Sequence, residues 1–209
     1  MTDTPSPFSS RVSGLSVLAL RERIALDLRD FFIAATGEAR ESAYAALLTL
    51  PPEKIGVSPA PPPRTKAERQ ALEYEFNRLF VGPGRVQAPP YASIYLDPEP
   101  QLMGRTTDDI RELMRAVGLS LRDQGREPED HLSFELELWC VLARLEAQYA
   151  ATPEVLQEIR DARRRFVREH LALWIPDFLQ RAGQGEHPIL RTVLQCLEWW
   201  LSTCSKEEI

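Results

Sequence analysis

Apolar residues return at three- to five-residue steps along much of this chain, which is the spacing of helices that bury one side. The first such stretch covers residues 15–35 and is followed by Gly37. A second covers residues 38–50 and is cut off by Pro51 and Pro52. Proline lacks the amide donor that a helix needs and restricts the residue before it. The pattern therefore predicts a helical hairpin at the start of the chain.

Residues 51–65 interrupt the helical pattern, because they contain six prolines. A helix is not expected there, and such a composition favours an extended, partly mobile linker. Helical spacing returns over residues 66–80 and stops at the sequence VGPG, whose two glycines and proline favour a loop. We expect this loop to run to about Gly104.

The second half of the chain predicts further helices. One begins at Thr106 or Thr107 and ends at Gly118, since a threonine followed by two aspartates is a good helix start. After a connector, Pro128 suits the first position of the next helix. This helix has one apolar side, and we expect it to be the central helix of the second lobe.

A long helical pattern then runs from Thr152 towards Gly183, and we expect it to bend or break near Pro176. The last helix opens at His187 and Pro188. No segment alternates like a strand, so the predicted fold class is all-α. We expect a flexible N-terminus over residues 1–13 and one helical-bundle domain over residues 14–205. One arrangement of this domain has two lobes joined by a hinge at residues 119–127.

The composition is that of an ordinary globular protein, with 44% hydrophobic and 27% charged residues in a chain of 209. No apolar run approaches the ~20 residues that span a bilayer, and the N-terminus lacks the pattern of a secretion signal. We therefore expect a cytoplasmic protein without membrane insertion. The formal charge of 25 − 31 = −6 disfavours a nucleic-acid partner and suits a basic peptide better.

The candidate metal and cofactor ligands do not form a known pattern. The cysteines have no CxxC spacing, which favours buried, unpaired thiols: Cys140, Cys196 and Cys204. No histidine follows a glutamate by three positions, as a helical di-iron site requires. The glycines of VGPG match neither a phosphate loop nor a dinucleotide motif. We expect no metal and no other cofactor.

Two stretches carry candidate chemistry. Residues 74–95 read YEFNRLFVGPGRVQAPPYASIY, and residues 127–131 read EPEDH. The first joins a helix end to a loop rich in proline and aromatic residues, which is typical of a groove that binds a peptide. The second offers acids and a histidine. Asp130 and His131 are neighbours on the expected helix and point about 100° apart, so a catalytic relay between them is disfavoured.

Five ordered blocks resemble the TorD/DmsD/NarJ family of chaperones for molybdenum-containing redox enzymes, and the DmsD and TorD branches most closely. The blocks are RLFVGPG at 78–84, APPYASIYLD at 88–97, EPEDH at 127–131, HLALWIPDF at 170–178 and EHP at 186–188. The resemblance implies an all-helical chaperone that binds the twin-arginine leader and apo form of a molybdopterin-containing oxidoreductase. Such a chaperone aids cofactor insertion and delays export.

The resemblance also implies which residues bind the leader. Glu127 and Asp130 are expected to pair with leader arginines, and His131 would orient Asp130 or donate to leader carbonyls. Apolar contact with the leader is expected from Phe76, Leu79, Phe80 and Tyr91. The expected leader-binding residues are Phe76, Leu79, Phe80, Pro90, Tyr91, Glu127, Asp130 and His131.

The sequence departs from the family pattern at two of these positions. Phe76 and Tyr91 stand where the DmsD branch typically has tryptophan, so neither the pocket's shape nor the client follows from the resemblance. The sequence does not decide whether the protein is a monomer or a domain-swapped homodimer, and the connector before EPEDH is the candidate hinge for such a swap. Two other functions also stay open: a NarJ-like assembly factor that binds the mature redox subunit, and a helical hydrolase that uses Glu127, Asp130 and His131.

Overall fold

The computed structural model describes residues 17–50, 52, 57–99, 101–120 and 127–206. Within these ranges the chain forms helices and loops, which confirms the all-α fold class. The expected flexible N-terminus at 1–13 lies outside the described residues. So do residues 121–126 of the candidate hinge, and Pro51 and residues 53–56 of the proline-rich linker.

The first two helices, α2 (Val17–Ile33) and α3 (Gly37–Leu47), form the expected hairpin. Thr36 caps α3, because its hydroxyl accepts a hydrogen bond from the amide of Ala39 at 3.2 Å. The buried guanidinium of Arg40 reaches back to the end of α2 and donates to the carbonyls of Phe31 and Ala34. Phe31 lies in the last turn of α2, where carbonyls lack a partner within the helix, and Ala34 follows the helix directly, so Arg40 ties the end of α2 to α3.

The next helix, α5 (Lys66–Phe76), begins with a capping box between Thr65 and Glu68 and continues as a π-helical turn, η1 (Asn77–Val81). It ends at Gly82, whose φ of 108° is reached easily only by glycine. The predicted helix over residues 66–80 therefore has the right extent, and the VGPG sequence ends it as expected.

The loop expected up to Gly104 contains a short helix, α6 (Ser93–Leu96), that the sequence pattern did not reveal. Four residues are too few for a helical period to show. Helix α7 (Arg105–Ala116) follows and begins one position before the expected threonines. Asp97 stabilises its first turn, since its carboxylate accepts hydrogen bonds from the amide and hydroxyl of Thr106.

Helix α8 (Leu132–Gln148) begins four residues after Pro128, so the prediction that Pro128 opens this helix is wrong. Residues 128–131 form a turn instead, and the backbone of His131 is extended at φ −68° and ψ 136°. His131 is the N-cap, and its side chain accepts a hydrogen bond from the amide of Ser133. A pairing with the distant residue Tyr91 holds His131 in this conformation.

The long pattern from Thr152 becomes α9 (Pro153–Phe166), a π-helical turn η2 (Val167–Leu171) and α10 (Ala172–Ala182). The interruption therefore lies before Pro176, which is inside α10. Pro176 has no amide to donate to the carbonyl of Ala172, and Ala172 is where η2 gives way to α10. The effect of the proline thus falls about one turn earlier than expected.

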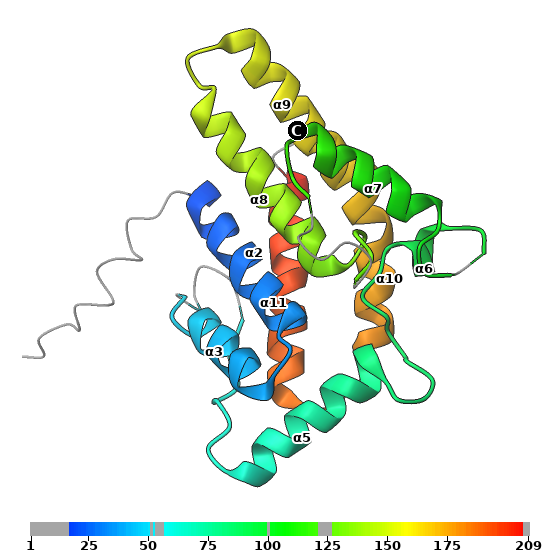
Figure 1. Cartoon of the computed structure of the whole chain (residues 1–209). Coiled ribbons are helices and arrows are strands. Elements are labelled where there is room, and N and C mark those ends of the chain that lie inside the picture. The colour runs from blue at the N-terminus through cyan, green and yellow to red at the C-terminus, as the bar shows by residue number, and fades with distance from the viewer. Residues whose placement is uncertain (1–16, 51, 53–56, 100, 121–126, 207–209) are drawn as a thin grey trace, which may run out of the picture.

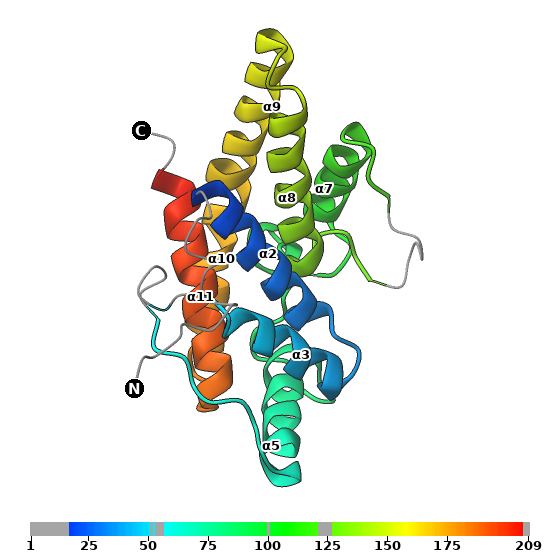
Figure 2. The same cartoon turned by 90° about the vertical axis from the view of Figure 1, so that its left-hand side faces the viewer.

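The last helix, α11 (Pro188–Ser205), starts at the predicted position with His187 as its N-cap. Figures 1 and 2 show α2 lying across α8 and α11 in the middle of the molecule. Three fully buried tryptophans anchor this region, and Trp139 of α8 meets Trp200 of α11 edge to face with ring centroids 5.3 Å apart. The third is Trp174 of α10. The three cysteines are free and buried, as predicted.

None of the helices in the described ranges is long and apolar enough to cross a membrane.

The central position of α2 predicts a large stability loss when its core side chains are shortened. Leu28 is fully buried, so Leu28→Ala should cost about 3 kcal/mol of the free energy of unfolding, through lost apolar contact and a cavity. Leu173 is 58% exposed, and Leu173→Ala is the matched control with an expected change within about 0.5 kcal/mol. Urea unfolding measures both, and equal losses would contradict this account of the core.

Candidate functional site

The two stretches singled out in the sequence meet in the structure. Tyr91 and His131 form an isolated antiparallel bridge. The amide of Ala92 donates to the carbonyl of Asp130 at 3.0 Å, and the amide of Leu132 donates to the carbonyl of Pro90 at 2.9 Å. This bridge fixes the segment before α6 against the start of α8, although 40 residues separate them in the chain.

Beside the bridge lies a groove of about 920 Å³. Its walls come from the end of α2, from α5 and η1, from residues 86–94 and from the start of α8. Six of the eight predicted leader-binding residues line it: Phe76, Phe80, Pro90, Tyr91, Glu127 and His131. The sequence missed other lining residues, among them Phe32, Ile33, Val81, Val86, Leu102 and Phe134.

Aromatic rings form the floor of the groove. The ring centroid of Phe80 lies 5.0 Å from that of Phe76 and 5.5 Å from that of Phe32, and all three side chains are nearly buried. Apolar side chains on the rim are exposed instead, with 40% of Ile33, 63% of Val81 and 49% of Leu102 accessible to solvent. An apolar ligand that covered this rim would gain free energy by removing it from water.

Glu127 brings a carboxylate to the groove. The hydroxyl of Tyr91 donates to its Oε2 at 2.7 Å. Burial, and then this hydrogen bond, raise the pKa of Tyr91 well above its ordinary value, so the hydroxyl stays protonated and keeps donating. Within the described part of the chain no cation lies within ion-pair distance of Glu127. Among the described residues, Glu127 therefore gives the groove a positioned negative charge that no cation compensates.

His131 adds a neutral donor. Burial lowers the pKa of His131 from 6.5 to about 4, so its imidazole is uncharged near neutral pH. Its Nδ1 accepts a hydrogen bond from the amide of Ser133 at 3.2 Å, which leaves the proton on Nε2. The ring packs between Tyr91 and Phe134, with centroids 5.0 Å and 5.9 Å away.

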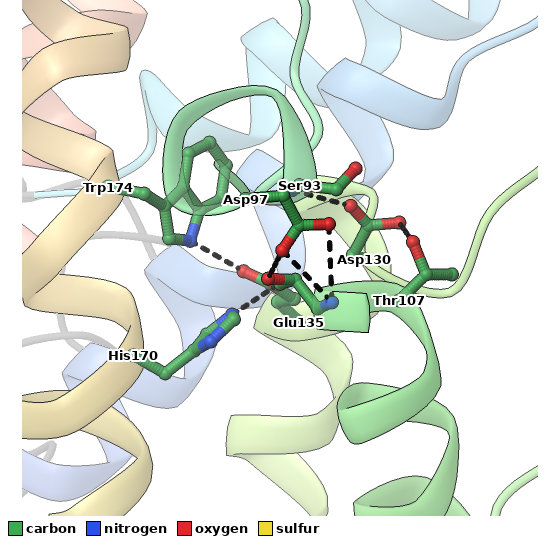
Figure 3. Close-up of polar contacts among 8 residues, drawn as sticks. Ser93, Asp97, Thr107, Asp130, Glu135, His170 and Trp174 are labelled. Carbon is green, nitrogen blue, oxygen red and sulfur yellow. Dashed lines mark hydrogen bonds and ion pairs between the residues drawn. The ribbon is translucent and has the colours of Figure 1, made fainter. Parts of the chain in front are cut away.

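The two remaining predicted residues do not line the groove. Asp130 is fully buried, and its carboxylate accepts hydrogen bonds from the amide of Ser93 at 2.8 Å and from the hydroxyl of Thr107 at 2.7 Å (Figure 3). It ties α6 and α7 to the start of α8, which differs from the pairing with leader arginines expected from the sequence. Leu79 is also fully buried, lies beside Gly185 and does not line the groove.

A second buried carboxylate supports α8 one turn further on. Glu135 accepts hydrogen bonds from Trp174 Nε1 at 3.0 Å and contacts His170 Nε2 at 2.6 Å (Figure 3). Burial opposes the charged form of His170, but attraction to the Glu135 carboxylate outweighs it and raises the pKa of His170. These contacts join α8 to η2 and α10, and they are part of the scaffold behind the groove.

The geometry does not assemble a nucleophile beside His131. The hydroxyl of Ser133 donates to the carbonyl of Arg29 at 3.1 Å and not to the imidazole. Both oxygens of Asp130 are engaged elsewhere. Among the described residues, no three His, Cys, Asp or Glu side chains are grouped so that they could hold a metal ion. What the site can do chemically is bind an apolar segment next to a positive charge.

Comparison with known proteins agrees with the sequence blocks. A family model described as nitrate reductase delta subunit matches residues 34–180. The chain belongs to this family. Its curated relatives include TorD and DmsD chaperones, which confirms the resemblance seen in the sequence motifs.

One relative in this family is a Haemophilus influenzae protein named "Probable Tat proofreading chaperone DmsD", which is 30% identical over 58% of this chain and 54% of its own length. A Vibrio cholerae protein named "Chaperone protein TorD" is 34% identical over 54% of this chain and 50% of its own. This chain thus spans about half the length of these relatives. A crystal structure of a candidate redox enzyme maturation protein from Archaeoglobus fulgidus superimposes with a TM-score of 0.48 at 24% identity, covering 86% of this chain and 94% of that one.

The low pKa of His131 predicts a pH-dependent stability. The unfolded imidazole takes up a proton near pH 6.5 and the folded one only near 4, so stability is full above about pH 6.5 and falls as the pH drops towards 4. Between about pH 7 and about pH 5 this group should remove about 2 kcal/mol. His131→Asn keeps a side chain that can cap α8 and removes the titration, so its stability should fall less over this range. Urea unfolding at several pH values measures the difference, and identical pH profiles would contradict a buried, neutral His131.

The role of Asp130 predicts a structural effect. Asp130→Ala should lower the free energy of unfolding by about 3 kcal/mol, because it leaves the amide of Ser93 and the hydroxyl of Thr107 buried without an acceptor. Asp108, which is exposed on α7, gives the matched control Asp108→Ala, for which little change is expected. Denaturant unfolding is the measurement. A loss of leader binding in Asp130→Ala without any loss of stability would favour direct contact with the ligand instead.

Proposed function

We propose that this protein is a cytoplasmic, system-specific chaperone for a molybdopterin-containing oxidoreductase. It binds the twin-arginine leader and the apo form of its client, aids insertion of the cofactor and delays export. The observation that carries this proposal is the groove beside the Tyr91–His131 bridge, where an aromatic floor lies next to a carboxylate that has no cationic partner among the described residues.

The groove matches the chemistry of such a leader. A twin-arginine leader joins a basic segment to an apolar one, and the groove offers Glu127 for the first and the aromatic floor for the second. A carboxylate and a guanidinium form strong, charge-assisted hydrogen bonds, and Glu127 keeps oxygen lone pairs free beyond the one that Tyr91 uses. The exposed rim residues Ile33 and Val81 add apolar area that a bound segment would cover.

The names of the family members support the same role. The Haemophilus relative is named a Tat proofreading chaperone, and the Vibrio relatives are named TorD chaperones. None of these names is that of an enzyme. We propose that this protein likewise acts by binding and release without turnover, in agreement with the engagement of Asp130 and Ser133 in structural hydrogen bonds.

A NarJ-like assembly factor that binds the mature part of the redox subunit is the alternative. One observation favours it: a second hollow of about 640 Å³ lies between α10 and α11, away from the groove. Leu179, Leu194 and Leu201 contribute to its lining. A surface of this kind could receive a folded subunit while the groove stays empty.

Calorimetric titration with leader peptides tests the proposal. Leaders of the twin-arginine-exported molybdoenzymes of the host are titrated into the protein, together with the same peptides in which both arginines are alanine. We expect micromolar or tighter binding of one leader, which corresponds to about 8 kcal/mol, and weaker binding of its alanine form.

The client protein without its leader separates the two candidate functions. Binding that needs the leader supports the leader-specific chaperone. Binding of the leaderless apoprotein with unchanged affinity, together with silence from every leader peptide, would contradict it and support the assembly factor.

A further inference from the structure

The charges that line the groove are distributed unevenly. Glu127 and His131 both contact Tyr91, and we call this part of the lining the Glu127 end. Its carboxylate has no cationic partner among the described residues, and its imidazole is neutral. The other end carries Glu73 and Arg40. There the carboxylate is compensated, because Arg40 Nε lies 3.0 Å from Glu73 Oε1. The lining residues that the structure describes therefore carry a net charge of one negative, and this charge lies at the Glu127 end.

The compensated end is also tightly held. The guanidinium of Arg40 lies 3.4 Å from the centroid of the Phe76 ring and donates to the carbonyls of Phe31 and Ala34. With only 4% of its side chain exposed, Arg40 cannot turn away to release Glu73 for an incoming arginine without leaving these partners. A second arginine of a ligand would therefore gain little at this end.

Between the two ends the lining is apolar. Phe80 links the floor near Phe76 to Phe32, and Phe134 packs against His131 on the side of Glu127. The rim beside these rings exposes Ile33, Val81 and Leu102, so an apolar side chain that covered it would remove this area from water, whereas a basic side chain there would gain no carboxylate. Only one direction puts the basic part of a leader at Glu127 and its apolar part on the floor.

We propose that a leader lies in this groove with one fixed polarity, its arginine end at Glu127 and its apolar segment over Phe32, Phe76 and Phe80, and that Glu127 binds only the arginine nearer the apolar segment. This inference rests on the proposed leader-binding function. The oxygen that accepts from Tyr91 is already partly used, so the carboxylate has room for one guanidinium. The other arginine stays in solvent.

Unequal effects of the two arginines test the inference. The probe is a synthetic leader peptide with two arginines followed by an apolar stretch, in four forms: intact, with either arginine changed to alanine, and with both changed. Replacing the arginine nearer the apolar stretch should weaken binding about tenfold, as expected for a hydrogen bond to a charged group, and replacing the other one less than about twofold.

The variant Glu127→Gln tests whether the arginine nearer the apolar stretch binds Glu127. In this variant the intact peptide should bind about tenfold more weakly, and the alanine form of the nearer arginine should bind as it does to the wild type. Glu112→Gln is the matched control, because Glu112 is exposed on α7 and outside the groove, and it removes the same charge. Equal effects of both arginines, or an additive effect of Glu127→Gln and the alanine forms, would overturn the inference.

Photocrosslinking determines the direction in which the peptide lies in the groove, with Glu127 left unchanged. A benzophenone amino acid in place of Phe134, which packs against His131, should label peptide residues next to the arginines. The same group in place of Asn77, one turn after Glu73 in η1, should label the apolar stretch. The opposite labelling, or labelling of the whole peptide from both positions, would contradict a fixed polarity. Failure of every leader to bind the wild-type protein would instead overturn the proposed function.

Discussion

The short bridge between Tyr91 and His131 is the interaction on which the groove depends. Two backbone hydrogen bonds join Pro90 and Ala92 to residues 130–132, and the carboxylate of Asp130 fastens the amide of Ser93 and the hydroxyl of Thr107 at the same point. An isolated pair of extended segments is not stable in water by itself. Here the residues of the bridge are largely buried among the helices, and the bridge in turn holds the segment before α6 against the start of α8.

Three buried carboxylates in the described part of the chain have partners within the protein, and Glu127 differs from them. Asp130 accepts two hydrogen bonds, Glu135 contacts His170 and Trp174, and Glu146 pairs with Arg163. A buried carboxylate without such partners would be costly, so these groups hold helices together and are not free for a ligand. Glu127 is partly exposed, and among the residues that the structure describes its side chain has only the hydroxyl of Tyr91 as a partner. Its negative charge is therefore available.

The sequence predicts the helices well and the groove in part, and the reasons are physical. Hairpins and long helices follow from apolar periodicity and proline, which are local signals. The first turn of α8 was misplaced because Pro128, Glu129 and Asp130 favour a helix start, whereas a bond to residue 90 decides it. Asp130 and Leu79 do not line the groove, because both side chains are fully buried in the packing around it, which the local sequence does not reveal. The contribution of Phe32 and Ile33 could not be read from sequence, because nothing local connects the end of α2 to residues 76–91.

The absence of tryptophan from the groove lining gives the protein a convenient optical property. Three of its four tryptophans, Trp139, Trp174 and Trp200, are fully buried in the helical core, while phenylalanine and tyrosine line the groove. Intrinsic tryptophan emission therefore reports on the integrity of the core. A ligand that enters the groove lies against phenylalanine and tyrosine instead, so this emission can serve as a check on folding during binding experiments, without attaching a dye to the protein.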